Sequence, residues 1–397
     1  MKQRNWRVIP LAGAAAAGAL IVTACGGGGD ASRESAQNVP SSHPAAASCD
    51  RGRLPSDHAQ SATGCDRPDN VIATWFGVTN HHYQIGDVSF IQDGQVDNYV
   101  GGTTPAQDAV NFVWSALEKG GATPPTHILI GHDHTADHSR NVPQWINRFP
   151  DVKVFGPKTL CDRLASQGIA NECTTLTPDK ADGNHVIQVS QHVQVRPVRW
   201  RHSNHSGCVT NTNTTPTYGF LITAITKQGP VNIYSNDSGS GTPGLLTTPV
   251  EDAVTGTYLP PMEALGNAMR GAGADYLDLW QGGSETRVIR QARHVVPAFK
   301  PRAYQPQHWA ERNLLQGVPY YFFPGPTFTQ YLADNNVKMV MQENYLDAVV
   351  VDKESTRRHP NPAVKAHMGL PADGPGPGPV GPHPRLADVP TGECVGD

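Results

Sequence analysis

A short apolar strand that runs directly into a loop of histidines and aspartates constrains the fold of this chain most. The text HILI (127–130) is short and apolar, as expected of a buried strand, and GHDHTADHS (131–139) follows it without a spacer. In α/β proteins, the loop after the carboxyl end of a buried strand is a favoured place for a site. We therefore expect an α/β domain whose strand ends carry the chemistry.

The loop has the residue types and the spacing of a metal site. His132 and His134 are two residues apart, so both rings can point to one side of an extended segment. Asp137 and His138 follow at once, where the chain turns toward a helix. Imidazole and carboxylate groups are the usual protein donors for zinc and related divalent ions. A polar surface loop is the alternative interpretation of the same run.

The composition bounds the class of protein. The 397 residues are 38% hydrophobic and 17% charged, which suits a globular domain with a sizeable core. These fractions exclude a disordered chain and a multi-span membrane protein. The formal net charge is -4 and no basic block stands out, so we expect no nucleic-acid partner.

The amino terminus is predicted to be an export signal. Three cationic residues, Lys2, Arg4 and Arg7, precede the apolar run VIPLAGAAAAGALIV, which is too short and too rich in alanine and glycine for a spanning helix. The following VTAC resembles the lipobox of bacterial lipoproteins, in which cleavage before Cys25 frees that cysteine for lipidation. This resemblance implies an exported lipoprotein of the cell envelope, periplasmic or at the outer membrane, tethered by acyl chains. An ordinary secretory signal cleaved elsewhere is the alternative.

Shifts in composition divide the chain into four segments. We expect a lipoprotein signal peptide at 1–24, a flexible spacer at 25–68, a folded domain at 69–367 and a Pro/Gly-rich tail at 368–397. All of the chemistry is then expected in the third segment.

The cysteines other than Cys25 are expected to be structural. Six remain of the seven, and an even number in an exported chain favours disulfides. Local spacing suggests two pairs and leaves a third: Cys49–Cys65, Cys161–Cys173 and Cys208–Cys394. None has the CxxC spacing of a zinc ribbon or a redox motif.

The order of predicted elements indicates the fold class. We expect strands at 71–78 and 87–93, a helix from Pro105 to about Gly120, a β-rich half at 185–235, a helix leading into a strand at 261–280, and a helix at 285–296. Strands come first, helices are interspersed, and strands and helices follow again. This order predicts a mixed α/β domain with two sheets.

Several stretches resemble, in the same order, the metallo-β-lactamase-fold hydrolase superfamily, whose signature is HxHxDH after a strand. Here the signature is lengthened by one residue to HxHxxDH. The text VIATWFGVTNHHYQIGDVSFIQDG is similar to the opening hairpin of the family, with Asp93 ending its second strand. Downstream, RHSNHSG offers His205, VNIYSNDSG offers Asp237, and AYQPQHWAER offers His308. The matches cover about residues 71 to 312.

This resemblance implies an αββα sandwich of two mixed β-sheets flanked by helices, with a binuclear metal site. One ion would be held by His132, His134 and His205, the other by Asp137, His138 and His308, with Asp237 between them. Two zinc ions, or another divalent metal, would lower the pKa of a water and supply hydroxide as the nucleophile. Asp137 would orient this nucleophile and accept its proton.

The extra residue in the signature raises the question of one metal or two. A bulge at Thr135-Ala136 would keep both ends of the motif in place. Without it, Asp137 and His138 would rotate away and the second ion would be lost.

Other positions keep two interpretations. His202 competes with His205 as the third histidine. His81 and His82 are expected in the turn of the first hairpin, solvated or at the mouth of the site. Asp133 is expected to be a polar spacer rather than a further ligand.

These features predict an exported metal-dependent hydrolase acting on an ester, a lactone or a phosphodiester. The substrate is expected to be a small or lipid-derived molecule, and the membrane contact to be the lipid anchor. A β-lactamase is one alternative, and a non-catalytic envelope lipoprotein that binds a metal or ligand on the same fold is another. A serine hydrolase is not supported, because the sequence has no GxSxG motif.

Overall fold

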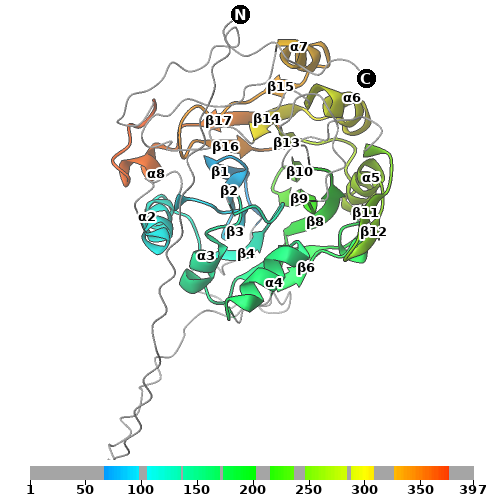
Figure 1. The fold of residues 1–397 in the computed structure, drawn as a ribbon. Helices are drawn as coiled ribbons and strands as arrows, with labels where there is room; N and C mark the ends of the chain where they lie inside the picture. Colours follow the sequence, from blue (N-terminus) through cyan, green and yellow to red (C-terminus); the bar gives the residue numbers. More distant parts are fainter. Residues whose placement is uncertain are drawn as a thin grey trace, which may run out of the picture. The chain divides into compact units, whose positions relative to one another are not determined.

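Two mixed β-sheets run through the domain (Figure 1). The structure is a computed structural model and describes residues 67–97, 105–135, 137–169, 173–202, 215–236, 246–283, 288–307 and 326–374. All of these residues belong to one compact unit, residues 46–397.

The first sheet has the strand order β17-β16-β1-β2-β3-β4-β5-β6. Pairing is antiparallel from β17 to β3 and parallel from β3 to β6. The strands are β1 (Val71–Gly77), β2 (Asn80–Ile85), β3 (Val88–Gln92), β4 (Pro125–Leu129), β5 (Lys153–Gly156), β6 (Cys173–Thr175), β16 (Ala348–Val351) and β17 (Thr356–His359).

The second sheet has the strand order β15-β14-β13-β10-β9-β8-β7. The strands from β10 to β15 pair parallel and those from β7 to β10 antiparallel. They are β7 (Ile187–Ser190), β8 (Val193–Trp200), β9 (Thr217–Thr226), β10 (Gly229–Asn236), β13 (Leu279–Gly283), β14 (Ala303–Gln307) and β15 (Lys338–Met339). A separate hairpin consists of β11 (Val250–Asp252) and β12 (Gly256–Tyr258).

The inner faces of the two sheets share one hydrophobic core. Because side chains alternate along a strand, every second residue points inward. On the first sheet Tyr83 and Leu129 belong to this core, and on the second Phe220 and Ile233 belong to it. The two sheets therefore pack face to face.

The outer face of each sheet packs against helices. Ile128 of β4 packs with α2, α3, α4 and α8, and Trp280 of β13 packs with α5, α6 and α7 (Figure 1). The helices are α2 (Ala106–Lys119), α3 (Val142–Arg148), α4 (Lys158–Ser166), α5 (Pro261–Ala272), α6 (Val288–Phe299), α7 (Pro326–Asp334) and α8 (Pro362–Ala366). The predicted αββα sandwich of two mixed sheets is confirmed.

A disulfide joins α4 to β6. Cys161 and Cys173 are bonded with a Cα–Cα distance of 5.4 Å, as their spacing predicts. The other two predicted pairs and Cys25 lie outside the described residues. Within the described part of the chain, no helix is long and apolar enough to cross a membrane.

The prediction that His81 and His82 lie in a turn is wrong. Both belong to β2, which pairs with β1 on one side and β3 on the other, and both side chains are buried. The turns lie outside them, at Gly77–Thr79 and at Gly86, where the backbone of both glycines has positive φ. Burial lowers the pKa of each histidine to about 4.

A third buried histidine, His127 of β4, predicts a loss of stability in acid. Burial lowers its pKa from the ordinary 6.5 to about 4. Its stabilising contribution is therefore complete above pH 6.5 and is lost as the pH falls toward 4, because only the unfolded chain takes up the proton easily. We expect the free energy of unfolding of His127→Gln to fall less than that of the wild type between pH 7.5 and pH 5, by about 1–2 kcal/mol.

Urea unfolding of the metal-free protein at the two pH values measures this difference. An exposed histidine serves as the control, and His359→Gln should keep the wild-type pH dependence. Equal pH dependence of the wild type and His127→Gln would contradict the assignment of a buried neutral ring.

Candidate metal centre

The histidine-rich loop begins at the junction of the two sheets. β4 leads into it, and Ile130 donates its backbone N–H to Phe155 of the adjoining strand at 2.8 Å. The carbonyl of Gly131 accepts from the backbone N–H of Tyr218 in the second sheet at 2.7 Å. The N–H of Gly131 donates to Asp93 Oδ1 at 2.8 Å. The entrance to the loop is therefore fixed from three directions.

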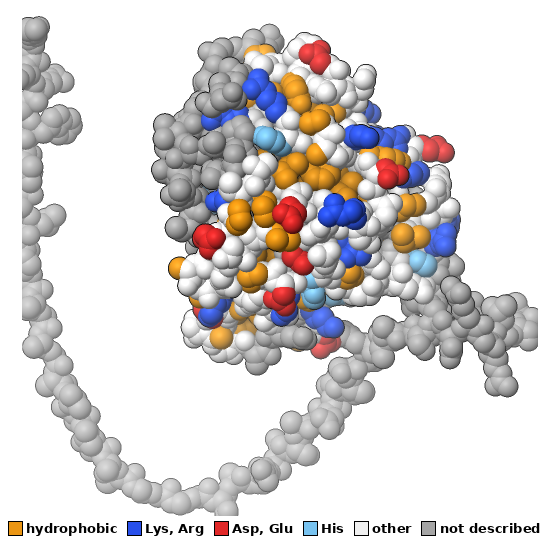
Figure 2. Space-filling view, turned by 90° about the vertical axis from the view of Figure 1, so that its right-hand side faces the viewer, with side chains coloured by type: hydrophobic (Ala, Val, Ile, Leu, Met, Phe, Trp, Pro, Cys, Tyr) orange, Lys and Arg blue, Asp and Glu red, His pale blue; other side chains and the backbone are white. Residues whose placement is uncertain are grey.

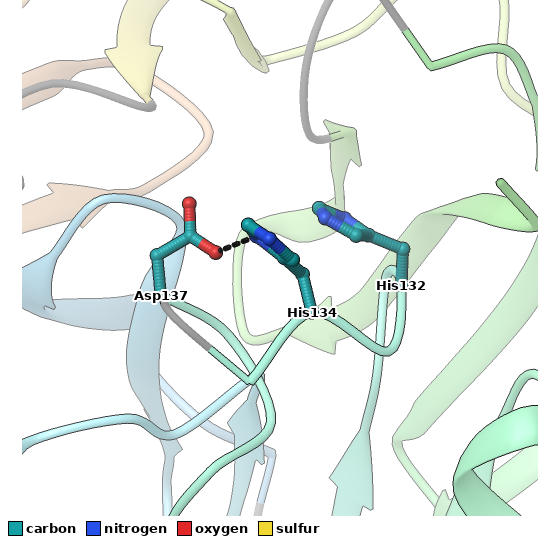
Figure 3. Close-up of side chains that lie close together, drawn as sticks. All are labelled: His132, His134 and Asp137. Carbon is teal, nitrogen blue, oxygen red and sulfur yellow. Dashed lines mark hydrogen bonds and ion pairs between the residues drawn. The ribbon is translucent and has the colours of Figure 1, made fainter. Parts of the chain in front are cut away.

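Three donor groups in the loop converge (Figure 3). His132, His134 and Asp137 each present a ligand atom, and these atoms lie within 4.8 Å of one another. His132 and Asp137 are buried, whereas the side chain of His134 is 59% exposed. His134 Nδ1 lies 2.5 Å from Asp137 Oδ1. Two imidazoles and a carboxylate at this spacing suit zinc and its neighbours.

His138 lies against the same group. Its ring centroid is 3.9 Å from that of His132, and its Nε2 is 3.5 Å from Asp137 Oδ2. Both ends of the lengthened signature are therefore together. The turn between them is closed by the carbonyl of His134, which accepts from the N–H groups of His138 and Ser139 at 2.9 and 3.1 Å. Thr135 in this turn is exposed, and Ala136 lies outside the described residues.

A buried carboxylate determines which nitrogen of His138 faces the other donors. His138 Nδ1 lies 3.0 Å from Asp93 Oδ2 and 2.7 Å from Thr79 Oγ1. Thr79 donates its one hydroxyl hydrogen to Asp93 at 2.5 Å, so it can only accept from the ring. The ring hydrogen therefore lies on Nδ1, and Nε2 carries the lone pair. Metal-ligating histidines commonly have this arrangement, with the second nitrogen bonded to a carboxylate.

Two further side chains hold the loop and were not identified in the sequence. Asn80 donates to the carbonyl of Asp137 at 2.9 Å, and Arg163 of α4 donates to Asp133 Oδ1 at 2.7 Å. Asp133 also accepts from Ser139 Oγ at 2.6 Å. This residue, predicted to be a polar spacer, therefore connects the loop to α4. Asn80 and Arg163 are far from the loop in sequence, so no local pattern identifies them.

Of the two candidates for the third ligand histidine, the structure describes His202 and not His205. The ring centroid of His202, two residues after β8, lies 4.7 Å from that of His132. His205, Asp237 and His308 lie outside the described residues, and their roles as ligands remain predictions. The residues just before two of them end strands of the second sheet that lie on either side of β13, since Asn236 ends β10 and Gln307 ends β14. Asn236 pairs with Gly219, the neighbour of Tyr218, so this strand end lies close to the loop.

A cavity of about 310 Å³ is lined by residues of α4, of the start of β9 and of the β11–β12 hairpin. Pro216, Tyr218, Ala253 and Val254 contribute apolar surface, and Lys158, Asp162, Glu251 and Asp252 contribute charged groups. Lys158 and Asp162 pair with each other at 2.7 Å. Tyr218 lines the cavity, and its backbone N–H donates to Gly131 at the start of the loop, which is the link between the two.

No family model and no curated protein matches the chain. Among solved structures, it is similar to a metallo hydrolase from the archaeon Ignicoccus hospitalis, with 14% identity over 71% of this chain and 98% of that one and a TM-score of 0.43. It is also similar to a diiron β-hydroxylase from Streptomyces venezuelae, with 11% identity, 72% and 54% coverage and a TM-score of 0.39. A subclass B3 metallo-β-lactamase of Bradyrhizobium japonicum matches with 11% identity, 55% and 79% coverage and a TM-score of 0.29. Likeness at this level says nothing about activity.

The contacts of Asp93 predict a loss of metal affinity when its charge is removed. In Asp93→Asn, one of the two acceptor oxygens becomes an NH₂ group that accepts no hydrogen bond, so either the Gly131 N–H or both Thr79 and His138 lose their acceptor. We expect zinc affinity to fall about 10- to 100-fold, which is the usual effect of removing the hydrogen-bond partner of a metal-ligating histidine.

Chelator competition on the purified protein measures this affinity. Asp278→Asn is the matched control, because Asp278 is equally buried but accepts from the N–H of Asn232 and is bonded to none of the described loop residues. Wild-type zinc affinity in Asp93→Asn would show that this carboxylate does not orient a ligand.

Proposed function

We propose that this chain is a metal-dependent hydrolase of esters, lactones or phosphodiesters. The observation that carries the proposal is the buried donor group of the loop, in which His132, His134 and Asp137 converge and His138 is oriented beside them. A histidine-rich surface loop would not need a buried carboxylate behind one of its rings.

The residues have distinct tasks in this proposal. His132 and His134 would hold one ion with His205, for which His202 is the competing candidate, and Asp137 and His138 would hold the other with His308. Asp237 would supply a further carboxylate ligand. A bound divalent ion supplies a water of lowered pKa and polarises the substrate oxygen.

Asp137 has the position of a proton acceptor. Its carboxylate is nearly buried, and its oxygens lie 2.5 Å from His134 Nδ1 and 3.5 Å from His138 Nε2. Asn80 holds its backbone carbonyl, so the carboxylate has little freedom to turn away. A carboxylate held this way can orient a nucleophile and take its proton.

The cavity lined by Tyr218 supports an ester with an apolar part. Lys158 and Asp162 pair with each other, Glu251 and Asp252 add negative charge to the lining, and Pro216, Tyr218 and Val254 supply apolar surface for a ligand. Burial of apolar ligand surface supplies affinity at about 25 cal/mol per Å².

The cellular setting is also part of the proposal. The signal sequence and Cys25 support an exported lipoprotein in the periplasm or at the outer membrane, with the spacer separating the domain from the membrane. A lipid-derived substrate fits this setting. Detection of acylated Cys25 by mass spectrometry of the membrane fraction tests the proposed lipid anchor.

Hydrolysis by the zinc-loaded domain tests the function. We expect turnover of a panel of p-nitrophenyl esters and a bis-p-nitrophenyl phosphodiester, and loss of this turnover with a chelator. His134→Ala and Asp237→Ala should reduce it by orders of magnitude, because each removes a ligand. His359→Ala, which removes an exposed histidine on β17, is the control and should keep it.

Two results would change the conclusion. Turnover restricted to nitrocefin would assign the chain to the β-lactamases. Bound metal without turnover of any of these substrates would favour a binding protein on the same fold.

Elemental analysis distinguishes one metal from two. Because Asp137 and His138 lie with His132 despite the extra residue, we expect about two zinc ions per chain, as in binuclear hydrolases. His138→Ala should reduce the count to about one. A count of one in the wild type would show that the lengthened signature has lost its second site.

A further inference from the structure

A strained turn between β1 and β2 lies beside the metal centre. Gly77 has a φ of 105° and Val78 a φ of 48°, and a β-branched residue in this left-handed region is rare. Thr79 follows, and its hydroxyl contacts both Asp93 and His138. The conformation of the turn therefore decides where this hydroxyl lies.

Three successive carbonyl groups of the turn each contact a different side chain. The pairs are Gly77 O with Asn80 Nδ2 at 2.9 Å, Val78 O with Trp75 Nε1 at 3.0 Å, and Thr79 O with His81 Nδ1 at 3.0 Å. All three side chains are buried. Strained backbone persists where its surroundings over-determine it, and these contacts do so here.

His81 also contacts the second sheet. The carbonyl oxygen of Thr79, which lies against His81 Nδ1, can only accept a hydrogen bond. The hydrogen of the His81 ring therefore lies on Nδ1, and Nε2 is an acceptor. Gln305 of β14 has its amide Nε2 at 3.3 Å from this nitrogen. Burial lowers the pKa of His81 to about 4, so the ring stays neutral and carries one N–H at neutral pH.

The amide of Gln305 is itself held in one orientation. Gln281 of β13 donates to Gln305 Oε1 at 2.8 Å, and the hydroxyl of Tyr83 donates to Gln281 Oε1 at 2.5 Å. Burial raises the pKa of Tyr83, so this hydroxyl keeps its proton. All of these side chains are buried between the sheets. A continuous chain of hydrogen bonds thus joins the second sheet to His81.

We infer that His81 is a positioning residue of the metal centre, which holds the Gly77–Thr79 turn against the second sheet and thereby places Thr79, Asp93 and His138. The inference rests on the proposed function in one respect, that His138 is a metal ligand. Among the described residues, His81 is bonded to none of the candidate metal ligands; it acts on His138 through the carbonyl and the hydroxyl of Thr79.

The experiment compares three variants of metal-free full-length protein titrated with Co²⁺. His81→Leu removes both ring hydrogen bonds, whereas His81→Asn keeps an N–H donor near the position of Nδ1. His127→Leu is the control, because His127 is also a buried neutral histidine of the first sheet, stacked on Phe155 and bonded to Thr126. The readouts are Co²⁺ affinity by chelator competition, the visible absorption of the bound ion, and urea unfolding without metal.

We expect His81→Leu to bind Co²⁺ about tenfold more weakly and with a changed spectrum, as for loss of an outer-shell partner. His81→Asn should restore most of the affinity. His127→Leu should lose stability but keep the wild-type affinity and spectrum. Gln305→Leu removes the hydrogen bond from the second sheet and leaves His81 in place, so it should give an intermediate loss of Co²⁺ affinity. This variant tests the inference if His81→Leu does not fold.

Wild-type affinity and spectrum in both His81→Leu and Gln305→Leu would overturn the inference and leave the proposed function intact. Equal losses of affinity in His81→Leu and His127→Leu would also overturn it, since they would reflect general destabilisation. Failure of the wild type to bind Co²⁺ or zinc would instead refute the proposed function.

Discussion

One buried carboxylate, that of Asp93, connects the parts of the centre. One of its oxygens accepts from the N–H of Gly131 and the other from Thr79 and His138. A fully buried charge is tolerable only when donors surround it, and these three supply the donors. The end of β3, the start of the metal loop and the β1–β2 turn therefore keep a common geometry, and the orientation of His138 follows from it.

The centre belongs to both sheets. The loop follows β4 of the first sheet, yet its first carbonyl is bonded to Tyr218 at the start of β9 in the second. His202 arrives from the end of β8 and lies against His132. Buried polar side chains, among them Gln281 and Gln305, occupy part of the space between the sheets, where apolar side chains are the usual filling. Hydrogen bonds among such buried polar side chains specify one relative position of the two sheets rather than adding much stability.

The sequence predicts the features that depend on neighbouring residues. The strand before the loop, the convergence of its donors and the Cys161–Cys173 disulfide all follow from local order and spacing. The strand β2 could not be recognised, because NHHYQI looks solvated until Gln305, more than 200 residues away, is known to cover it. The contacts of Asn80 and Arg163 with the loop could not be predicted for the same reason, because their partners are distant in sequence. The apolar run of β16 (Ala348–Val351) is typical of a strand but does not indicate its partner, and its place beside β1 comes from pairing across the whole domain.

Val78 has a consequence for engineering this protein. A valine with positive φ costs about 1 kcal/mol relative to a residue that adopts this conformation freely. Glycine at this position would relieve the strain, but it would also remove the fully buried side chain of Val78 from the core, at a larger cost. The same replacement would allow the backbone beside Thr79 to sample other conformations. An engineer who removed the strain at this residue would therefore lose core packing and order of the centre together.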